Sequence, residues 1–154
     1  MAKPSLKIKI SFKLRNTTIS DKQDLFLWRN HPDIRRNSLN MSKLSWEEHN
    51  RWFDEKIKDI NTKSYIAYCD IDKIGTIRFE IKKDHIRTSV MLNPAFIGKG
   101  FGSKLIRRGI DKYIRETKPD RPIIAEIKKS NVASMKAFEK SGFIESHIVY
   151  VFKT

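Results

Sequence analysis

Three glycines, Gly98, Gly100 and Gly102, alternate with other residues directly before a segment rich in lysine and arginine. Alternating glycines let the backbone approach a ligand closely and let successive amide groups point into one concavity. A helix that begins after them would add unpaired amides and the positive end of its dipole. The pattern therefore predicts a seat for a pyrophosphate, with Lys99 and Lys104 adding charge. The alternative is a flexible turn. A dinucleotide-binding motif needs wider glycine spacing and a later acidic residue, and a P-loop needs Gly-Lys-Ser/Thr; neither pattern is present.

The overall charge points to an anionic partner. The 154 residues include 32 Lys and Arg against 18 Asp and Glu, a formal net charge of +14. Residues 97–118 hold seven basic and two acidic residues, so +5 of the surplus lies beside the glycines. Such a surplus is typical of proteins that bind nucleic acid, an anionic membrane surface or a phosphate-bearing small molecule. For this segment alone, the alternative is a solvated basic helix face.

The elements that would position the loop can be predicted from hydrophobic periodicity and turn residues. Alternation predicts a strand over residues 7–15, and capping boxes at Ser20–Gln23 and Ser45–Glu48 predict two helices. His31-Pro32 is expected to end the first of these helices. The other predicted elements are a three-strand meander (65–69, 74–81, 86–92), a helix after the glycines, a strand (123–127), a helix (130–142) and a last strand (146–152). One α+β (mixed α/β) domain over residues 1–154 is therefore predicted.

Composition excludes several classes of protein. Cys69 is the only cysteine, so no internal disulfide or cysteine-rich metal site can form, and we expect no metal. No apolar run is long enough to cross a membrane, and no signal peptide is visible. We therefore expect a cytoplasmic protein without a membrane partner.

Two ordered motifs resemble the GNAT family of N-acetyltransferases. Residues 97–105 are similar to its pyrophosphate loop, Gln/Arg-x-x-Gly-x-Gly/Ala, with Ile97 in place of the leading Gln or Arg. Residues 131–143 are similar to its Asn-x-x-Ser…Tyr-Glu-Lys-x-Gly-Phe segment, with Phe138 in place of the tyrosine. The resemblance implies one mostly antiparallel sheet of about six or seven strands, flanked by about four helices, with a V-shaped splay between two parallel strands.

In that family acetyl-coenzyme A is the acetyl donor, and the resemblance implies which residues would hold it. The strand before the glycines would pair with the pantetheine arm, and the glycine loop would take the pyrophosphate. For Asn131, an additional or alternative role is the N-terminal cap of a helix. The expected cofactor-binding residues are Val90, Met91, Leu92, Ile97, Gly98, Lys99, Gly100, Phe101, Gly102, Ser103, Asn131, Ser134 and Phe138.

Residues 28–36 and 45–53 are similar to one branch of the family, the nucleotide-linked amino-sugar N-acetyltransferases of the pseudaminic acid pathway type. The resemblance implies a UDP-linked amino sugar as the small-molecule amine acceptor. Core packing is the alternative role for Trp28 or Trp52. Arg35 and Arg36 are adjacent, so at most one of them is expected to reach a ligand from a helix. The expected substrate-binding residues are Trp28, Arg29, His49 and Trp52.

Acetyl transfer requires a neutral amine, which a base can provide. The candidate catalytic residues are Glu80, His49 and Glu126. Their alternative roles are a solvated strand carboxylate for each glutamate and a nucleotide contact for the histidine. Phe138 stands where the family's tyrosine acts as an acid, so the thiolate would leave unprotonated or take its proton from Tyr150 or water.

The charge also bears on the acceptor. A protein of charge +14 would attract an anionic amine such as a nucleotide sugar and repel a polyamine or an aminoglycoside. Two alternatives stay open: a protein N-terminal acetyltransferase, and a catalytically inactive GNAT fold that binds nucleic acid or a protein. An intact pyrophosphate loop argues against the second, so nucleic acid is not the expected partner. A monomer or a homodimer is expected.

Overall fold

The computed structural model describes residues 11–147 and 150–153. Five strands and five α-helices lie within these residues, with two short 3-10 helices at Ile19–Asp21 and Pro94–Phe96. In chain order the elements are β1 (Phe12–Asn16), α1 (Lys22–Asn30), α2 (Pro32–Asn37), α3 (Trp46–Lys58), β2 (Thr62–Cys69), β3 (Asp72–Ile81), β4 (Ile86–Leu92), α4 (Phe101–Thr117), β5 (Ile123–Ala125) and α5 (Val132–Lys140).

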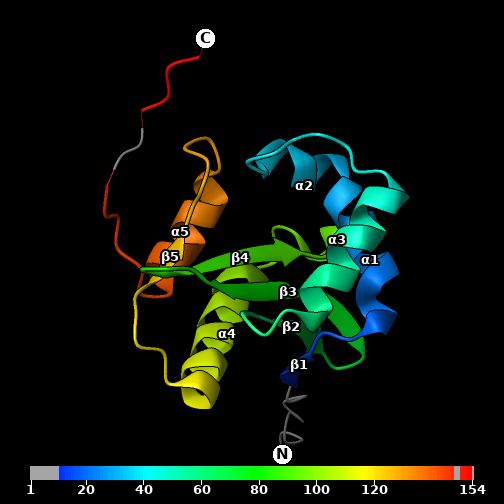
Figure 1. The fold of residues 1–154 in the computed structure, drawn as a ribbon, viewed down its shortest axis with the longest axis horizontal. Helices are drawn as coiled ribbons and strands as arrows, with labels where there is room; N and C mark the ends of the chain where they lie inside the picture. The colour runs from blue at the N-terminus through cyan, green and yellow to red at the C-terminus, as the bar shows by residue number, and fades with distance from the viewer. Residues whose placement is uncertain (1–10, 148–149, 154) are drawn as a thin grey trace, which may run out of the picture.

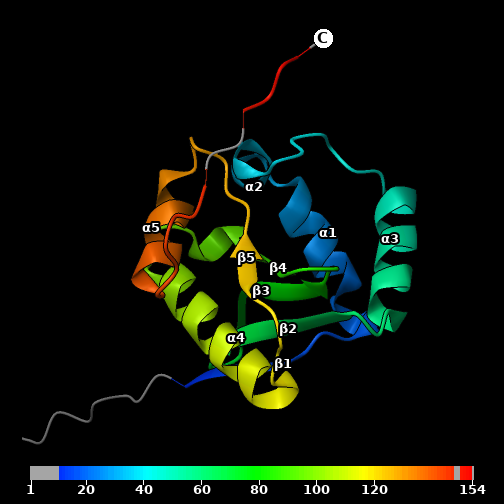
Figure 2. The same ribbon diagram turned by 60° about the vertical axis from the view of Figure 1, so that its left-hand side comes forward.

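The strands form a single sheet in the order β1-β2-β3-β4-β5. The first three pairings are antiparallel, and β5 joins β4 in parallel after the crossover through α4. Helices cover both faces of the sheet, with α1 and α3 on one side and α4 and α5 on the other (Figures 1 and 2).

Alternation along β2 explains this layering. Tyr65 and Ala67 point into a core that includes Leu105 and Tyr113 of α4, and the Tyr113 ring stacks on Phe79 with centroids 4.1 Å apart. Ile66, between them in sequence, packs instead with Leu25, Trp28 and Phe53 of α1 and α3. Because successive side chains of a strand point to opposite faces, one strand contributes to two cores.

The sheet opens between its two parallel strands. Only three residue pairs join β4 to β5, and the last is Thr88 opposite Ala125. Strand β4 continues to Leu92, whereas β5 ends at Ala125. The edge of β4 over residues 89–92 that faces away from β3 therefore has no strand beside it. This is the V-shaped splay that the resemblance implies, and the prediction of a mixed α/β fold around a mostly antiparallel sheet is confirmed.

Local signals predicted several elements well. The box at Ser45–Glu48 forms: the Ser45 amide donates to the Glu48 carboxylate at 2.8 Å, and the Glu48 amide donates to Ser45 Oγ at 3.1 Å. The meander, the helix after the glycines and the helix that follows Asn131 also form, with boundaries within a few residues of those predicted.

Other predictions need correction. The first helix does not begin with a box at Ser20; Asp21 instead accepts a hydrogen bond from the Thr18 amide, and a 3-10 turn leads into α1. His31-Pro32 ends α1 as predicted but also starts α2, which the sequence did not predict. Within residues 146, 147 and 150–153 there is no strand, so the described residues give five strands rather than six or seven. Residues 7–10 of the first predicted strand lie outside the described residues.

Candidate functional site

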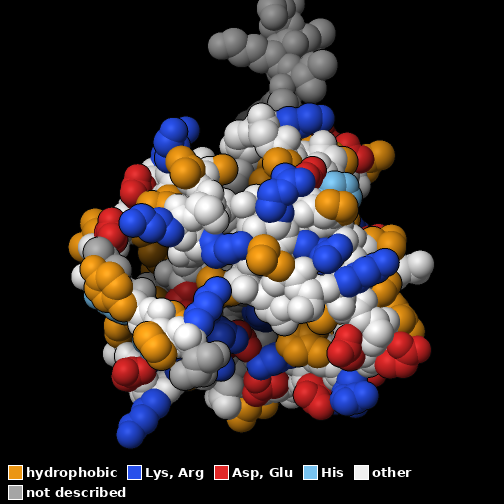
Figure 3. Space-filling view, turned by 90° about the horizontal axis from the view of Figure 1, so that it is seen from above, with side chains coloured by type: hydrophobic (Ala, Val, Ile, Leu, Met, Phe, Trp, Pro, Cys, Tyr) orange, Lys and Arg blue, Asp and Glu red, His pale blue; other side chains and the backbone are white. Residues whose placement is uncertain are grey.

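A cavity of about 940 Å³ opens at the splay. One part of its wall comes from the free edge of β4, the glycine loop, the segment after β5 and α5. The other part comes from α1, α2, α3 and the adjoining ends of β2 and β3. In the view from above, Lys and Arg side chains are spread across the surface, while most Asp and Glu side chains lie nearer its edge (Figure 3).

The glycine loop has the geometry of an anion seat. Gly98 and Gly100 have φ angles of 76° and 79°, in the left-handed region that side chains avoid, and α4 begins at Phe101. A Cβ atom at either glycine would meet nothing within 4 Å, so the loop faces open space. The first amides of α4 lack partners within the helix, and the helix dipole is positive at this end. The loop therefore fits a pyrophosphate.

The remaining cofactor candidates lie along the same side of the cavity. Val90, Met91 and Leu92 line it along the free edge of β4, where their backbone is available to an extended ligand. Ile97, Phe101, Ser103, Asn131, Ser134 and Phe138 line it as well.

Two of these residues also have structural roles. The Asn131 side chain caps α5 by accepting a hydrogen bond from the Ser134 amide at 3.1 Å, as its alternative role predicted. The Phe138 ring is 5% exposed and meets the edge of Phe143.

The lysines beside the loop are placed differently from the prediction. The ammonium group of Lys99 lies over the Phe96 ring, 5.5 Å from its centroid, and that of Lys104 lies 5.1 Å from the centroid of Phe12. Neither residue belongs to the lining of the cavity. The backbone of the loop, rather than these side chains, forms the seat.

The four acceptor candidates separate into two groups. Arg29, His49 and Trp52 line the cavity, whereas Trp28 is 8% exposed and packs with Leu25 and Phe53 in the core between α1, α3 and the sheet. The structure thus gives Trp28 the packing role, because its ring has no access to a ligand.

The arginines that follow on α2 stay outside the cavity. Arg35 donates from Nε to the Met41 carbonyl at 3.0 Å, and Arg36 pairs with Asp33 at 3.1 Å. Arg29 is therefore the arginine of the N-terminal segment that reaches the site.

Glu80 is held in a network of cations. Its carboxylate accepts hydrogen bonds from Lys56 and Arg87, both at 2.6 Å, and Arg78 lies 3.6 Å away. Burial alone would raise the pKa of Glu80, but Lys56, Arg87 and the charge of Arg78 lower it to about 2. A carboxylate this acidic is a weak base, so we do not retain Glu80 as a catalytic candidate.

His49 is 2% exposed and lies among aromatic rings. Its Nε2 is 2.8 Å from the Lys22 carbonyl oxygen, which accepts a hydrogen bond from the protonated nitrogen. Burial lowers the pKa of His49 more than this hydrogen bond raises it. The imidazole is consequently neutral at pH 7 and forms part of the cavity wall.

Glu126 differs from Glu80 and His49 in its exposure and in its lack of a polar partner within the described part of the chain. It lies directly after the last paired residue of β5, is exposed, and lines the cavity. Its carboxylate makes no ion pair with the residues that the structure describes. Of the three catalytic candidates, Glu126 alone is an exposed carboxylate without an ion-pair partner among the described residues.

Sequence reasoning missed Arg78, Arg87 and Lys56, which all line the cavity. Arg78 and Glu80 lie on one face of β3, and the cross-strand partner of Glu80 is Arg87. The Arg78 guanidinium lies 4.8 Å from the centroid of the Trp52 ring. No local pattern predicts this cluster, because it depends on sheet register and on how α3 packs against β3.

The described part of the chain holds no cluster of His, Cys, Asp or Glu that would bind a metal. It also contains no helix long and apolar enough to span a membrane.

Comparison with known proteins agrees with the fold. Residues 12–144 match the acetyltransferase (GNAT) domain family. Two curated relatives, both named acetyltransferase PseH from Campylobacter jejuni, are 27% and 29% identical over 135 residues; the match covers 85% of this chain and 83% of each relative.

Solved structures of the same fold are also similar. Spermidine N-acetyltransferase from Vibrio cholerae, in complex with CoA and spermine, has a TM-score of 0.80 at 20% identity; the match covers 92% of this chain and 86% of that one. The aminoglycoside acetyltransferase AAC(6')-Ib, in complex with coenzyme A, has a TM-score of 0.77 at 20% identity, with coverage of 90% and 87%.

Proposed function

The chain belongs to the GNAT acetyltransferase family, and we propose that it acetylates a phosphate-bearing amine, such as a nucleotide-linked amino sugar. As a member of this family it is an N-acetyltransferase that uses acetyl-CoA. The observation that carries the proposed acceptor is the positive charge of the acceptor side of the cavity, where Arg29, Arg78 and Arg87 are among the lining residues. Similarity to the two PseH acetyltransferases favours the same branch of the family.

The splay and the glycine loop would hold acetyl-CoA, which supplies the acetyl thioester. The free edge of β4 at residues 89–92, which faces away from β3, suits an extended pantetheine arm. The loop from Gly98 to Ser103 suits the pyrophosphate, because its amides face open space at the positive end of α4. Both interactions use the backbone, so Ile97 in place of the family's Gln or Arg leaves them intact.

The acceptor amine must lose its proton before it attacks. A site rich in guanidinium groups disfavours an ammonium ion and so lowers the pKa of a bound amine. Glu126, at the vertex of the splay, is our candidate to accept that proton. Phe138 has no proton to give, so the thiolate leaves unprotonated or takes a proton from water.

The same charge argues against the acceptors for which two neighbours of similar fold are named, spermidine and aminoglycosides. Polycationic acceptors would have to enter a cavity whose arginines repel them. Of the three acidic residues in its lining, as far as the structure describes it, Asp33 pairs with Arg36 and Glu48 accepts a hydrogen bond from the Ser45 amide, which leaves Glu126 as the one carboxylate open to a cationic acceptor.

A panel of acceptors tests the proposal. Release of free thiol from acetyl-CoA would be followed with a UDP-linked amino sugar, spermidine, kanamycin and a peptide with a free N-terminus. We expect turnover with the UDP-linked amino sugar and little with the others. Faster turnover of spermidine, kanamycin or the peptide than of the nucleotide sugar would overturn the proposal.

A further inference from the structure

The unsatisfied buried side-chain atoms of the described residues all belong to residues that line the cavity. Three buried side-chain nitrogen or oxygen atoms lack a hydrogen-bond partner there: Thr17 Oγ1, Arg29 Nη1 and Arg78 Nε. All three residues line the cavity at the splay. An unmade hydrogen bond to a buried charged group is costly, so two guanidinium donors without acceptors in one cavity point to an anionic ligand.

Arg78 is fixed in position without being neutralised. Its guanidinium lies 4.8 Å from the centroid of the Trp52 ring. Its Nε is 3.6 Å from a Glu80 oxygen, too far for a hydrogen bond, and Glu80 already binds Lys56 and Arg87. Three cations therefore share one carboxylate, and these four side chains keep a net charge of +2.

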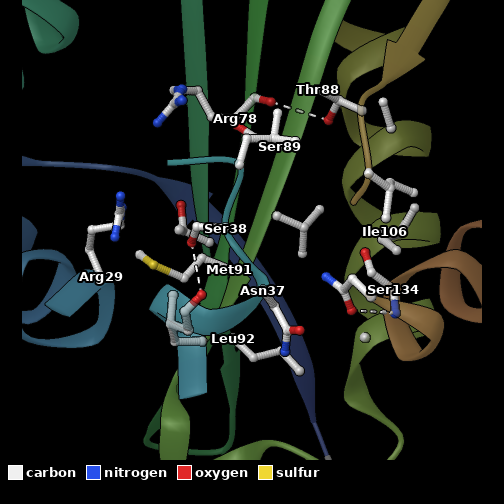
Figure 4. A pocket seen from close by; sticks show the side chains of 18 of the residues that line it. Arg29, Asn37, Ser38, Arg78, Thr88, Ser89, Met91, Leu92, Ile106 and Ser134 are labelled. Atoms are coloured by element: carbon white, nitrogen blue, oxygen red, sulfur yellow. Dashed lines mark hydrogen bonds between the residues drawn. The ribbon is translucent and has the colours of Figure 1, made fainter. Parts of the chain in front are cut away.

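Arg29 is anchored in a comparable way. Its Nη2 donates to the Asn40 carbonyl, which is uncharged, and Nη1 remains free. Burial and, to a smaller extent, Arg35 lower the pKa of Arg29, yet an arginine stays protonated at neutral pH. Arg29 and Arg78 come from α1 and β3 and lie on the same side of the cavity, across from Ile106 and Ser134 (Figure 4).

From this arrangement we infer that Arg29 and Arg78 form a phosphate subsite for the acceptor, separate from the pyrophosphate seat at Gly98–Ser103. Guanidinium forks match phosphate oxygens, and Nη1 of one arginine and Nε of the other are donors that a phosphate would satisfy. The inference rests on the proposed function, because it assigns the phosphate to the acceptor.

Trp52 is predicted from the sequence to be a substrate-binding residue, and the subsite makes that role an indirect one. Because one face of its ring carries the Arg78 guanidinium, Trp52 acts as a positioning residue for that cation rather than as a stacking surface for a nucleobase on that face. Its substitution should weaken phosphate binding through Arg78.

Binding measurements on the whole chain test the subsite. UDP, inorganic pyrophosphate and uridine would be titrated calorimetrically with CoA at saturation, so that the seat at Gly98–Ser103 is filled. We expect UDP and pyrophosphate to bind and uridine to bind far more weakly. Equal affinities for UDP and uridine, or no binding of either phosphate compound, would overturn the inference.

Variants locate the contacts. Arg29→Gln and Arg78→Gln should each weaken UDP binding by about ten- to a hundredfold, the range of a lost hydrogen bond to a charged group. Arg115→Gln, the matched control at an exposed position of α4 outside the cavity, should change it by less than about twofold. Arg78→Lys should recover part of the loss, and Trp52→Leu should weaken UDP binding while CoA affinity is unchanged in every variant.

Two outcomes distinguish this inference from the proposed function. If the glutamine variants of Arg29 and Arg78 bind UDP as tightly as Arg115→Gln does, the subsite is wrong, even if the wild type acetylates a UDP-linked amino sugar. If the wild type binds UDP through these arginines but transfers no acetyl group to a UDP-linked amine, the subsite stands and the proposed acceptor fails. If a glutamine variant loses CoA binding together with UDP binding, that variant is misfolded. The UDP affinity of Arg78→Lys, which keeps the positive charge, then decides whether the subsite stands.

Discussion

Glu80 shows how far a residue's chemistry depends on its partners. As an acidic residue that alternates with apolar neighbours on a strand, it had the features of a catalytic base. In the structure it is 2% exposed and is shared by Lys56, Arg78 and Arg87. The role of Glu80 is to hold these cations at the cavity wall. We therefore expect a substitution of Glu80 to lower the stability of the fold.

We expect Glu80→Gln to lower the free energy of unfolding at pH 7 by about 3 kcal/mol, since a pKa lowered from 4.5 to about 2 corresponds to roughly that energy. The folded-state pKa is depressed, so this contribution is present above the unfolded value and is lost as the pH falls toward 2. Urea unfolding of wild type and variant at several pH values would measure it. Glu139→Gln, at an exposed helix position, is the control and should cost less than about 0.5 kcal/mol. A difference between wild type and Glu80→Gln that does not shrink in acid would contradict this account of the network.

Glu126 should affect rate instead of stability. Its exposed carboxylate lies at the vertex of the splay, so Glu126→Gln should leave the unfolding transition unchanged. We expect kcat to fall by about a hundredfold, the lower end of what a general base contributes. Steady-state kinetics with the acceptor, and a CoA titration as the control for cofactor affinity, would separate the two effects. An unchanged kcat would mean that the positive cavity alone deprotonates the amine.

At the scale of elements, the glycine loop and α4 form one unit. Gly100 takes a left-handed φ of 79° as the residue before α4, and its missing side chain leaves the seat open. We expect Gly100→Ala to cost about 1–2 kcal/mol of stability from backbone strain and to weaken CoA binding at least about tenfold.

Gly142 provides a matched control for this substitution. It has a φ of 98° but does not belong to the lining of the cavity. Gly142→Ala should therefore carry a comparable strain without affecting CoA affinity. Thermal unfolding and CoA titration of both variants would test the pair, and equal losses of CoA affinity would show that strain, not the seat, explains the effect.

The sequence predicts best those elements that depend on contacts between residues near one another in the chain. The Ser45–Glu48 box is a contact within one helical turn, and the glycine spacing indicated the loop directly. Pro32 was interpreted as a stop, but proline disfavours a helix before it and suits the first turn of the next one, so both α1 and α2 meet there.

Long-range packing explains what the sequence could not predict. Trp28 and Trp52 are the same residue type, and each follows a helix start signal in the sequence. Trp28 nevertheless lies in the core, whereas Trp52 lines the cavity. The pairing of Arg78 with Trp52 joins α3 to β3 across 26 positions of the chain, and only the folded arrangement reveals it.

At the scale of the whole molecule, part of the surplus of +14 lies at the two proposed anion sites. One is the loop with its basic helix, and the other is the arginine cluster of the acceptor side. Because these charges attract phosphate through solvent, kcat/KM for a nucleotide-linked acceptor should fall several-fold when salt rises from about 0.05 to 0.5 M. The same series with the free amino sugar serves as the control and should show a weaker dependence. Equal salt dependence for the two acceptors would contradict the steering.

The most direct test of the account compares one amine in two forms. The kcat/KM for a UDP-linked amino sugar would be measured against that for the same amino sugar without the nucleotide, at a fixed, saturating concentration of acetyl-CoA. Because the phosphate contacts would be lost while the reacting amine stays the same, we predict a preference of at least about a hundredfold for the UDP-linked form. Equal values, or a preference for the free sugar, would contradict the claim that this acetyltransferase selects its acceptor by phosphate.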